Sequence, residues 1–388
     1  MQDPKITHFP VGNGDCSLIT LSDNTQVLID CNTTEDASDD SVDERYDVHG
    51  YLLKYGKKHD GKIKIPHIDA FILTHADQDH CRGFETMFYT GDPAAYSAKH
   101  EQQGLLLIDE LWFTPRIFCP HDTEMCKPAQ AFRKEALRRM DLHKKLAPER
   151  NNRGNRLRIV GYTDNPDRKG LDHLTSVPGT YVDVIDGKKK TDFRFFIHAP
   201  FKLESDSKWS ERNDTSLVLQ ARFDVDGTPD AAFAIFGGDA GAAIWEKILQ
   251  RSGDESTLQW DLLLAPHHCS WTFFSEQPYK DNKTPAKSSL AILGKAMNGA
   301  RIIASCKPIR DDDDNPPHWA AAQLYKKAVG AERFHVTSET PSEKRPLPIE
   351  FSISENGPVL EESPAASAVA SSAAMRTAVS TPQTYGRH

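Results

Sequence analysis

The N-terminal part of the chain alternates between short apolar runs and polar breaks. Residues 5–11, 16–21 and 26–31 are rich in Ile, Leu, Val and Phe, and Gly, Asn, Ser and Asp separate them. Runs of this length bounded by turn residues are typical of β-strands. A fourth run, residues 67–74, is mostly apolar and passes directly into a cluster of His and Asp. The pattern therefore predicts strands near the N-terminus and a polar constellation at the end of one buried strand.

The rest of the chain mixes strand and helix patterns. Residues 128–146 place Phe132, Ala136, Leu137 and Met140 at helical spacing, with basic residues on the other face. We expect further helices at 48–58, 83–89, 242–249 and 319–329, and further strands at 108–114, 180–186, 192–199, 215–223, 231–239, 260–268, 301–306 and 348–354. Such a mixture predicts an α/β fold built in layers.

The composition favours one large domain followed by a tail. The chain has 388 residues, of which 38% are hydrophobic, so it can bury a large core. We assign residues 1–355 to this domain and treat the less regular stretch of about 91–190 as an insertion. Twelve of the eighteen residues from Ser363 to Ser380 are Ala or Ser. Because such a segment buries little apolar area, residues 356–388 are predicted to be disordered, with an Ala-rich helix that docks on a partner as the alternative.

Charge is unevenly distributed along the chain. The formal net charge is -9, which argues against general binding of polyanions, but residues 127–158 contain eleven Lys or Arg against three acids. This stretch could contact the phosphates of a nucleic-acid substrate, or it could be an ordinary solvated helix face. It lacks the interleaved aromatic residues that would stack bases. The predicted phosphate contacts are Arg138, Arg139, Lys144 and Lys145.

Three further features bear on the compartment. The seven cysteines are odd in number and lack CxxC spacing, so neither a disulfide framework nor a cysteine zinc module is expected. The N-terminal residues do not combine a basic segment with an apolar one, and no apolar stretch reaches the roughly 18 residues of a membrane helix. These features predict a protein of the cytoplasm that does not enter a membrane.

The strongest chemical signal is "THADQDH", residues 74–80. It places His75, Asp77, Asp79 and His80 directly after a buried strand. Imidazole nitrogens and carboxylate oxygens are the ligands of borderline and hard divalent metals. Two later strands end in the same kinds of group, namely "FGGD" on Asp239 and "APHH" on His267 and His268.

These segments resemble the metallo-β-lactamase fold superfamily, most closely the soluble metallohydrolase domain of the ComEC/Rec2 competence proteins. The resemblance is carried by residues 11–19, 27–31, 74–83, 213–219, 236–240 and 264–270, and less clearly by 304–319. It implies an αββα sandwich with a dinuclear metal site at one edge of two mixed sheets. His75 and Asp77 would bind one metal, Asp79, His80 and His267 the other, and Asp239 would bridge them.

The chain departs from the family pattern in three respects. Asp77 stands where many members have histidine, which makes manganese as plausible as zinc. Cys269 stands where the family usually has glycine. One histidine ligand of the family has no clear counterpart, and Asn213, Asp214 and His198 are open candidates for it.

The resemblance and the residue chemistry assign supporting roles. Asp15 and Asp30 would accept hydrogen bonds from ligand imidazoles, and Asn213 and Ser270 would support the site from behind. Lys307 would pair with a phosphate oxygen. Asp79, His268 and His318 are the predicted catalytic residues, and either histidine would protonate the leaving group.

The function predicted from these features is hydrolysis at two divalent metal ions, Zn²⁺ or Mn²⁺, with a metal-bridging hydroxide as the nucleophile. A phosphodiesterase, most simply a nuclease, leads. The first alternative is hydrolysis of a small-molecule ester, lactone, thioester or β-lactam, because a fold hosts many chemistries. The second is an interaction module without catalysis.

Overall fold

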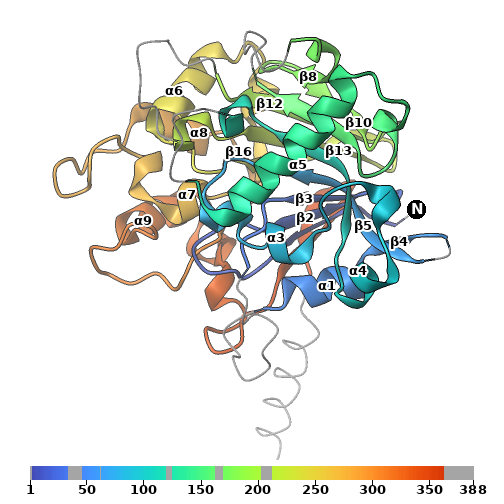
Figure 1. Ribbon diagram of the computed structural model, residues 1–388. Coiled ribbons are helices and arrows are strands. Elements are labelled where there is room, and N and C mark those ends of the chain that lie inside the picture. The colour runs from blue at the N-terminus through green and yellow to red at the C-terminus, as the bar shows by residue number, and fades with distance from the viewer. Residues whose placement is uncertain are drawn as a thin grey trace, which may run out of the picture.

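The computed structural model describes residues 2–33, 46–61, 63–118, 125–161, 169–201 and 212–361. Two sheets stack face to face and helices cover their outer faces (Figure 1). The predicted tail lies mostly outside these residues. No helix in the described ranges is long and apolar enough to cross a membrane.

The first sheet is mixed and contains the N-terminal strands. Its strand order is β19-β18-β1-β2-β3-β5-β6-β7-β8, and β4 pairs with β5. Strands β3, β5, β6, β7 and β8 run parallel in succession, whereas β1, β2, β18 and β19 pair antiparallel. The strands are β1 (Lys5–His8), β2 (Ser17–Thr20), β3 (Gln26–Ile29), β4 (Lys57–His59), β5 (Ile65–Ile72), β6 (Leu107–Phe113), β7 (Arg156–Val160), β8 (Thr175–Ser176), β18 (Ile349–Ser354) and β19 (Gly357–Leu360).

The second sheet has the order β17-β16-β15-β14-β13-β12-β9. Strands β14, β15, β16 and β17 run parallel, and β13 pairs antiparallel with β12 and β14. Its strands are β9 (Tyr181–Val182), β12 (Phe193–Ala199), β13 (Val218–Val225), β14 (Thr228–Phe236), β15 (Trp260–Leu264), β16 (Ala296–Ala304) and β17 (Phe334–Val336). A separate hairpin joins β10 (Val184–Ile185) to β11 (Lys188–Lys189).

Helices cover both outer faces. On the first sheet lie α1 (Val48–Tyr55), α2 (Gln78–Cys81), α3 (Phe84–Met87), α4 (Ala98–Gln102) and α5 (Lys127–Lys144). The second sheet carries α6 (Ala242–Arg251), α7 (Pro266–Cys269), α8 (Lys287–Leu293) and α9 (Trp319–Val329). The short 3-10 helices include η7 (Arg212–Thr215), η8 (Glu255–Leu258) and η9 (Trp271–Phe273).

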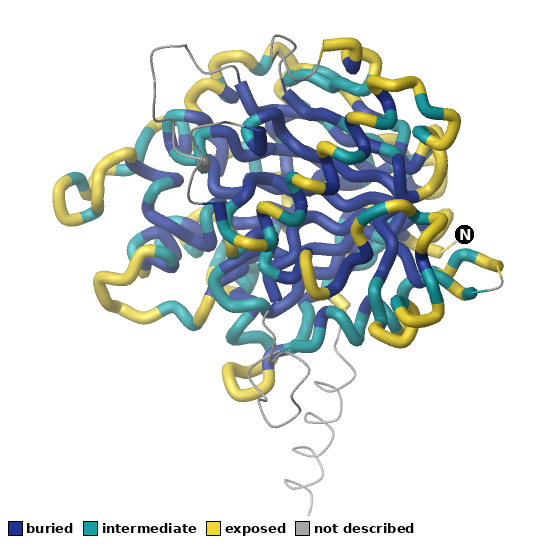
Figure 2. The backbone as a smooth tube through the Cα atoms, viewed as in Figure 1, coloured by how far each residue is buried: buried dark blue, intermediate teal, exposed yellow. Residues whose placement is uncertain are grey.

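Buried side chains form three main layers of core. One lies between the sheets, where the rings of Trp112 and Phe195 meet at 5.8 Å. The second packs α1, α3 and α5 on the first sheet, and the third packs α6, α8 and α9 on the second. Buried backbone runs through the middle of the molecule (Figure 2). The predicted α/β sandwich is therefore present.

Two predicted boundaries need correction. The stretch 91–190 is not a separate helical insertion, because it supplies β6, β7 and β8 to the first sheet and β9 to the second. The tail was predicted to start at residue 356, yet residues 357–360 form β19 on the edge of β18. Residues 362–388 lie outside the described part of the chain. The turn "ENG" at 355–357, bounded by alternating apolar residues, is a hairpin signal that the composition argument overlooked.

The sheets place the ends of several strands side by side. In the first sheet β3 and β5 are parallel, and in the second β14 and β15 are parallel. A backbone hydrogen bond from Leu217 N to Thr74 O, 3.0 Å long, joins the two sheets at this edge. The residues that follow these strands are therefore brought together.

Candidate metal centre

The centre is built on the segments that follow β5, β14 and β15. His75 and His80 follow β5, Asp239 follows β14, and His267 and His268 follow β15. Gly238, at φ +47, lets the segment after β14 lie close to Thr74 and Ser216. A Cβ at this position would be only 3.1 Å from Thr74 and 3.2 Å from Ser216. Its carbonyl accepts a hydrogen bond from His267 N at 3.0 Å, which ties the second segment to the third.

Asp239 lies at the middle of the centre and is almost fully buried. Its Oδ1 is 3.0 Å from His80 Nε2 and 3.5 Å from His268 Nε2. Its Oδ2 is 3.5 Å from His75 Nε2 and 3.4 Å from His267 Nε2. One carboxylate thus faces two pairs of imidazoles, one pair on each oxygen.

Each imidazole is oriented from behind through its Nδ1. Nδ1 of His80 lies 2.7 Å from Asp30 Oδ2, and Nδ1 of His268 lies 3.3 Å from Asp15 Oδ1. Carboxylates accept only, so both Nδ1 atoms carry a proton toward them. This is the arrangement in which outer carboxylates fix the tautomer of metal-binding histidines.

Hydroxyl groups fix the other two imidazoles. Thr74 Oγ1 donates to Asp30 Oδ2 at 2.6 Å, so at 3.3 Å it accepts from His75 Nδ1. Thr272 Oγ1 donates to Ser270 Oγ, so at 2.9 Å it accepts from His267 Nδ1. All four imidazoles therefore direct Nε2 toward Asp239.

Two further carboxylates border the centre. Asp79 Oδ2 lies 3.4 Å from His268 Nε2, and Asp77 Oδ2 lies 3.7 Å from His75 Nε2. Their side chains are 33% and 27% exposed, and that of His267 is 19% exposed, whereas those of His75, His80 and His268 are buried. The centre is therefore open to solvent on the side of Asp77, Asp79 and His267.

The turn that carries both late histidines has an unusual backbone. His267, His268 and Cys269 all adopt the left-handed conformation, with φ of 50°, 53° and 66°. Consecutive non-glycine residues seldom do so, since each costs roughly 1 kcal/mol or more. The turn places neighbouring imidazoles on different oxygens of Asp239. The strain at this turn is a local sign of a functional site.

The charges of the centre are strongly coupled. Burial lowers the pKa of His80, but Asp239 and Asp30 outweigh it, so this pKa lies well above its usual value. The same balance, through Asp239 and Asp15, raises the pKa of His268 to about 10. Burial raises the pKa of Asp239, but the surrounding imidazoles outweigh it and hold that pKa well below its usual range.

The donor set fits divalent metal ions. Asp15, His80, Asp239 and His268 each offer one ligand atom, and these four atoms lie within 4.8 Å of one another, all on buried residues. Lone pairs of several imidazoles and carboxylates facing one another repel unless protons or cations lie between them. The raised pKa values of His80 and His268 indicate that protons compensate the charge of Asp239 when no cation is bound.

The structure brings together the six predicted ligands but divides them differently from the prediction. His267 lies on the Oδ2 side of Asp239 with His75, rather than with Asp79 and His80. His268, predicted to donate a proton, is fully buried between His80, Asp79 and Asp239. Its Nε2 faces Asp239 and Asp79 rather than solvent.

His198, one candidate for the missing histidine, lies outside the centre. His198 donates from Nε2 to Thr257 O at 2.9 Å, away from Asp239. The carbonyl of Asn213 accepts from Ser216 N at 3.0 Å, and Ser216 Oγ accepts from Asp239 N at 3.2 Å. Asn213 is thus connected to Asp239 through Ser216, and Asp214 follows it in η7. The position on the His75 side is occupied by His267.

Ser270 and His318 lie next to the late histidines. Ser270 Oγ donates to Asn315 Oδ1 at 2.8 Å and accepts from Thr272. His318 N donates to Cys269 O at 3.0 Å, and its Nδ1 accepts from Ala320 N at 3.2 Å. Neutral His318 therefore keeps a proton on Nε2. Burial lowers the pKa of His318, which favours this neutral form.

The predicted substrate contacts are only partly available. Lys307 Nζ is paired with Asp314 at 2.6 Å, so a phosphate would have to replace that carboxylate. Arg139 is fully buried, and it donates to Glu135 and to the carbonyls of Ile108 and Arg156. The prediction that Arg139 contacts a substrate is wrong, because its guanidinium fastens α5 to β6 and β7.

The other basic side chains of α5 differ in their exposure and in their hydrogen-bond partners. Arg138 donates to Glu135, to Asn155 and to the carbonyl of Gly154, so its donors are committed within the fold. Lys145 is exposed and paired with Asp141, and Lys144 is exposed. Both lie at the end of α5 remote from Cys126, whose Sγ is 3.8 Å from Cys81 in α2. The 18 residues of α5 span about 27 Å, so Lys144 and Lys145 lie about that far along the helix from Cys126.

Sequence reasoning missed several residues that orient the imidazoles. Thr74 and Thr272 fix the tautomers of His75 and His267, and Ser216 holds the backbone of Asp239. Thr74 stands next to the first ligand in the sequence and could have been found. Thr272 and Ser216 could not, since only the folded backbone brings them to the centre.

No protein-family model matches the chain, and no curated protein matches it. Among solved structures, one that aligns is from Parabacteroides distasonis and is described provisionally as a metal-dependent hydrolase. The two chains are 12% identical, the alignment covers 86% of this chain and 92% of the other, and the TM-score is 0.35. A TM-score this low does not establish a common fold, and the function proposed below follows from the side chains of this chain alone.

Proposed function

We propose that the chain is a dinuclear metal-dependent hydrolase of the metallo-β-lactamase fold superfamily and that its substrates are phosphodiesters, above all those of nucleic acids. The observation that carries the proposal is the convergence of four Nε2 atoms on the two oxygens of Asp239. The sandwich of two mixed sheets with helices outside supports membership of that superfamily.

The two oxygens of Asp239 define two half-sites. His75, His267 and Asp77 would hold one ion on the Oδ2 side, and His80, His268 and Asp79 would hold the other on the Oδ1 side. Divalent ions, when bound, supply Lewis acidity toward a phosphoryl oxygen and a nucleophile at neutral pH. The carboxylates make the donor set hard enough for manganese as well as zinc.

The surrounding residues have separate tasks. Asp15 and Asp30 keep a proton of His268 and of His80 on Nδ1, so that Nε2 can bind a metal ion. The exposed side of Asp77, Asp79 and His267 admits the substrate. His318, with its proton on Nε2 and its ring 5.7 Å from that of Trp271, would donate a hydrogen bond to the departing oxygen.

The exposed cations of α5 nearest the centre support a polyanionic substrate. Lys127 begins the helix next to Cys126, which contacts Cys81 of α2. Lys127 and Lys134 are both exposed and line a pocket between α3 and α5. Because phosphate contacts of lysine do not depend on sequence, the expected affinity is general and falls with salt.

The decisive experiment combines elemental analysis with a substrate panel. Purified protein is expected to carry up to two divalent ions and to cleave single- or double-stranded nucleic acid and bis(p-nitrophenyl) phosphate with Mn²⁺ or Zn²⁺. Asp239→Asn should lose both ions and about a thousandfold or more of the activity. Asp281→Asn, an exposed carboxylate elsewhere, is the matched control.

Two outcomes would change the assignment. Turnover of a lactone, thioester or β-lactam without any phosphodiester would favour the small-molecule alternative. Protein that binds no divalent ion and hydrolyses nothing in the panel would overturn the hydrolase itself. Activity that survives in Asp239→Asn would trace to a contaminant and count against the proposed centre.

A further inference from the structure

A second pocket lies at the far end of α6 from the metal centre. It has a volume of about 440 Å³ and lies between β9 and β12 on one side and the end of α6 with η8 on the other. Small-molecule sites typically measure about 300–1,000 Å³. The ten residues of α6 span about 15 Å, so the pocket is separate from Asp239.

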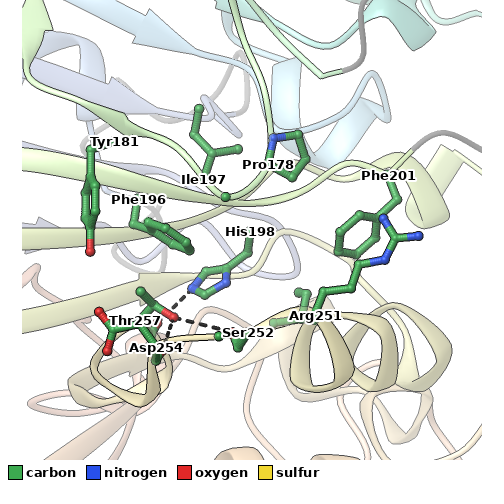
Figure 3. A pocket seen from close by; sticks show the side chains of 13 residues that line it. Pro178, Tyr181, Phe196, Ile197, His198, Phe201, Arg251, Ser252, Asp254 and Thr257 are labelled. Atoms are coloured by element: carbon green, nitrogen blue, oxygen red, sulfur yellow. Dashed lines mark hydrogen bonds between the residues drawn. The ribbon is translucent and has the colours of Figure 1, made fainter.

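Aromatic rings form one wall of this pocket (Figure 3). The rings of Tyr181 and Phe196 lie 5.0 Å apart at 60°, and those of Phe196 and His198 lie 4.9 Å apart at 73°. Tyr181 is 47% exposed, so part of its ring is free to meet a ligand. Such a wall suits a flat aromatic ring, which gains by stacking or edge contact.

A buried histidine supplies an acceptor in the middle of the pocket. His198 is 4% exposed, and its Nε2 donates to Thr257 O at 2.9 Å. Burial lowers the pKa of His198 to about 4, so the ring is neutral at pH 7. With the proton on Nε2, Nδ1 keeps a lone pair, and no described residue donates to it. An N–H group of a ligand would satisfy this acceptor.

Charged groups stand at two ends of the opposite wall, which the end of α6 and η8 form. The guanidinium of Arg251 lies over the ring of Phe201 at 4.6 Å and has no carboxylate partner among the described residues. Asp254, whose carboxylate accepts from Ser256 N at 2.9 Å, lies on the side of Thr257 (Figure 3). A cation suits a phosphate, and a carboxylate suits hydroxyl or N–H donors.

We propose that this pocket binds a nucleotide, with its base against Tyr181 and Phe196, an N–H of the base on His198, and its phosphate on Arg251. The same chemistry is presented by a free mononucleotide and by one unit of a polynucleotide. The proposal does not depend on catalysis at the metal centre. If the centre cleaves nucleic acid, the pocket would hold one nucleotide of the strand away from the cleaved bond.

Binding of defined ligands to the full chain tests the proposal. Calorimetric titration with adenosine 5′-monophosphate, adenosine and ribose 5-phosphate is done with a chelator present, so that metal ions do not hold the phosphate. The mononucleotide should bind at least about tenfold more tightly than either fragment. Arg251→Gln should weaken its binding about tenfold, while Lys247→Gln, an exposed control one turn earlier, should not.

A second variant and a second ligand complete the test. Phe196→Leu keeps an apolar side chain but removes the ring. It should weaken binding of the nucleotide about fivefold without changing the affinity for ribose 5-phosphate. A tetranucleotide that binds more tightly than the mononucleotide, with the same dependence on Arg251, identifies a polymer unit. Equal affinities for the tetranucleotide and the mononucleotide identify a free nucleotide as the ligand. Ribose phosphate that binds as tightly as the mononucleotide, or equal effects of Arg251→Gln and Lys247→Gln, would overturn the proposal.

Discussion

Asp30 would not touch a metal ion, yet it organises half of the centre. Its carboxylate accepts from His80 Nδ1, from Thr74 N and from Thr74 Oγ1, and Thr74 in turn holds His75. It does so from the left-handed conformation, with φ of 57°. One buried carboxylate thus fixes the tautomers of two imidazoles that face Asp239.

Asp30→Asn is therefore expected to weaken metal binding while the fold survives. Asparagine tolerates the left-handed backbone but removes the charge that holds His80. Loss of such an outer partner typically lowers metal affinity about 10–100-fold. Competition titration with a chromogenic chelator measures it, with Asp226→Asn, an exposed aspartate at φ 48°, as the matched control. Equal affinity in both variants would contradict the role of Asp30.

The titration of His268 predicts how chelator-treated protein responds to alkali. Its pKa is raised from 6.5 to about 10 in the folded chain. The protonated ring therefore contributes stability that is complete below pH 6.5 and is lost as the pH rises through about 10. Thermal unfolding followed from pH 7 to 10 should show a falling melting temperature. His268→Gln should flatten this fall, and an unchanged slope in that variant would count against it.

The residues that meet around Asp239 were readable from the sequence, but their pairing on its two oxygens was not. His75, Asp77, Asp79 and His80 stand out because chemistry-bearing residues follow an apolar strand without a gap. The roles of His267 and His268 depend on three left-handed residues in a row. Sequence patterns describe extended and helical backbone, so a turn of this kind cannot be anticipated from them.

At the scale of single elements, α5 shows where charge counting fails. Phe132, Ala136 and Met140 of its predicted apolar face are fully buried on the first sheet, but Leu137 is 45% exposed, so that its placement was wrong. Its charged face was taken to be solvated, yet Arg139 turns inward and pairs with Glu135 at 2.8 Å. The sequence spacing of four residues was compatible with either role, and only the neighbouring strand ends decide between them.

Arg139→Ala should consequently destabilise the protein without altering nucleic-acid binding. Removing the buried guanidinium takes one of two arginine partners from Glu135, which Arg138 still holds, and a donor from two carbonyls, which typically costs about 1–3 kcal/mol. Lys144→Ala, on the exposed end of the same helix, should stay within about 0.5 kcal/mol. Urea unfolding measures both. A loss of nucleic-acid affinity with unchanged stability in Arg139→Ala would restore the original assignment.

At the scale of the whole molecule, both ends of the described chain meet in one sheet. Strand β18 pairs with β1, and β19 pairs with β18 on its outer edge. Leu360 packs against the core between the sheets. The layered α/β fold was predictable from the strand and helix patterns, but the closing hairpin was hidden by the Ala- and Ser-rich composition that follows it.

Truncation compares the two possible ends of the domain. A chain that stops after Glu355 loses β19 and uncovers the edge of β18, which should lower the free energy of unfolding by about 2–4 kcal/mol. A chain that stops after Glu361 keeps the hairpin and is the reference. Chemical denaturation of both proteins measures the difference. Equal stability would mean that β19 adds nothing to the sandwich.

The left-handed turn at His267–Cys269 has one more consequence. His267 and His268 are adjacent in one turn but face different oxygens of Asp239, so the two half-sites share this backbone segment. Capture of the first cation would fix the geometry that the second requires. Loading is then expected to be cooperative, with chains holding one ion scarce at every concentration of added metal, and native mass spectrometry would count the species directly.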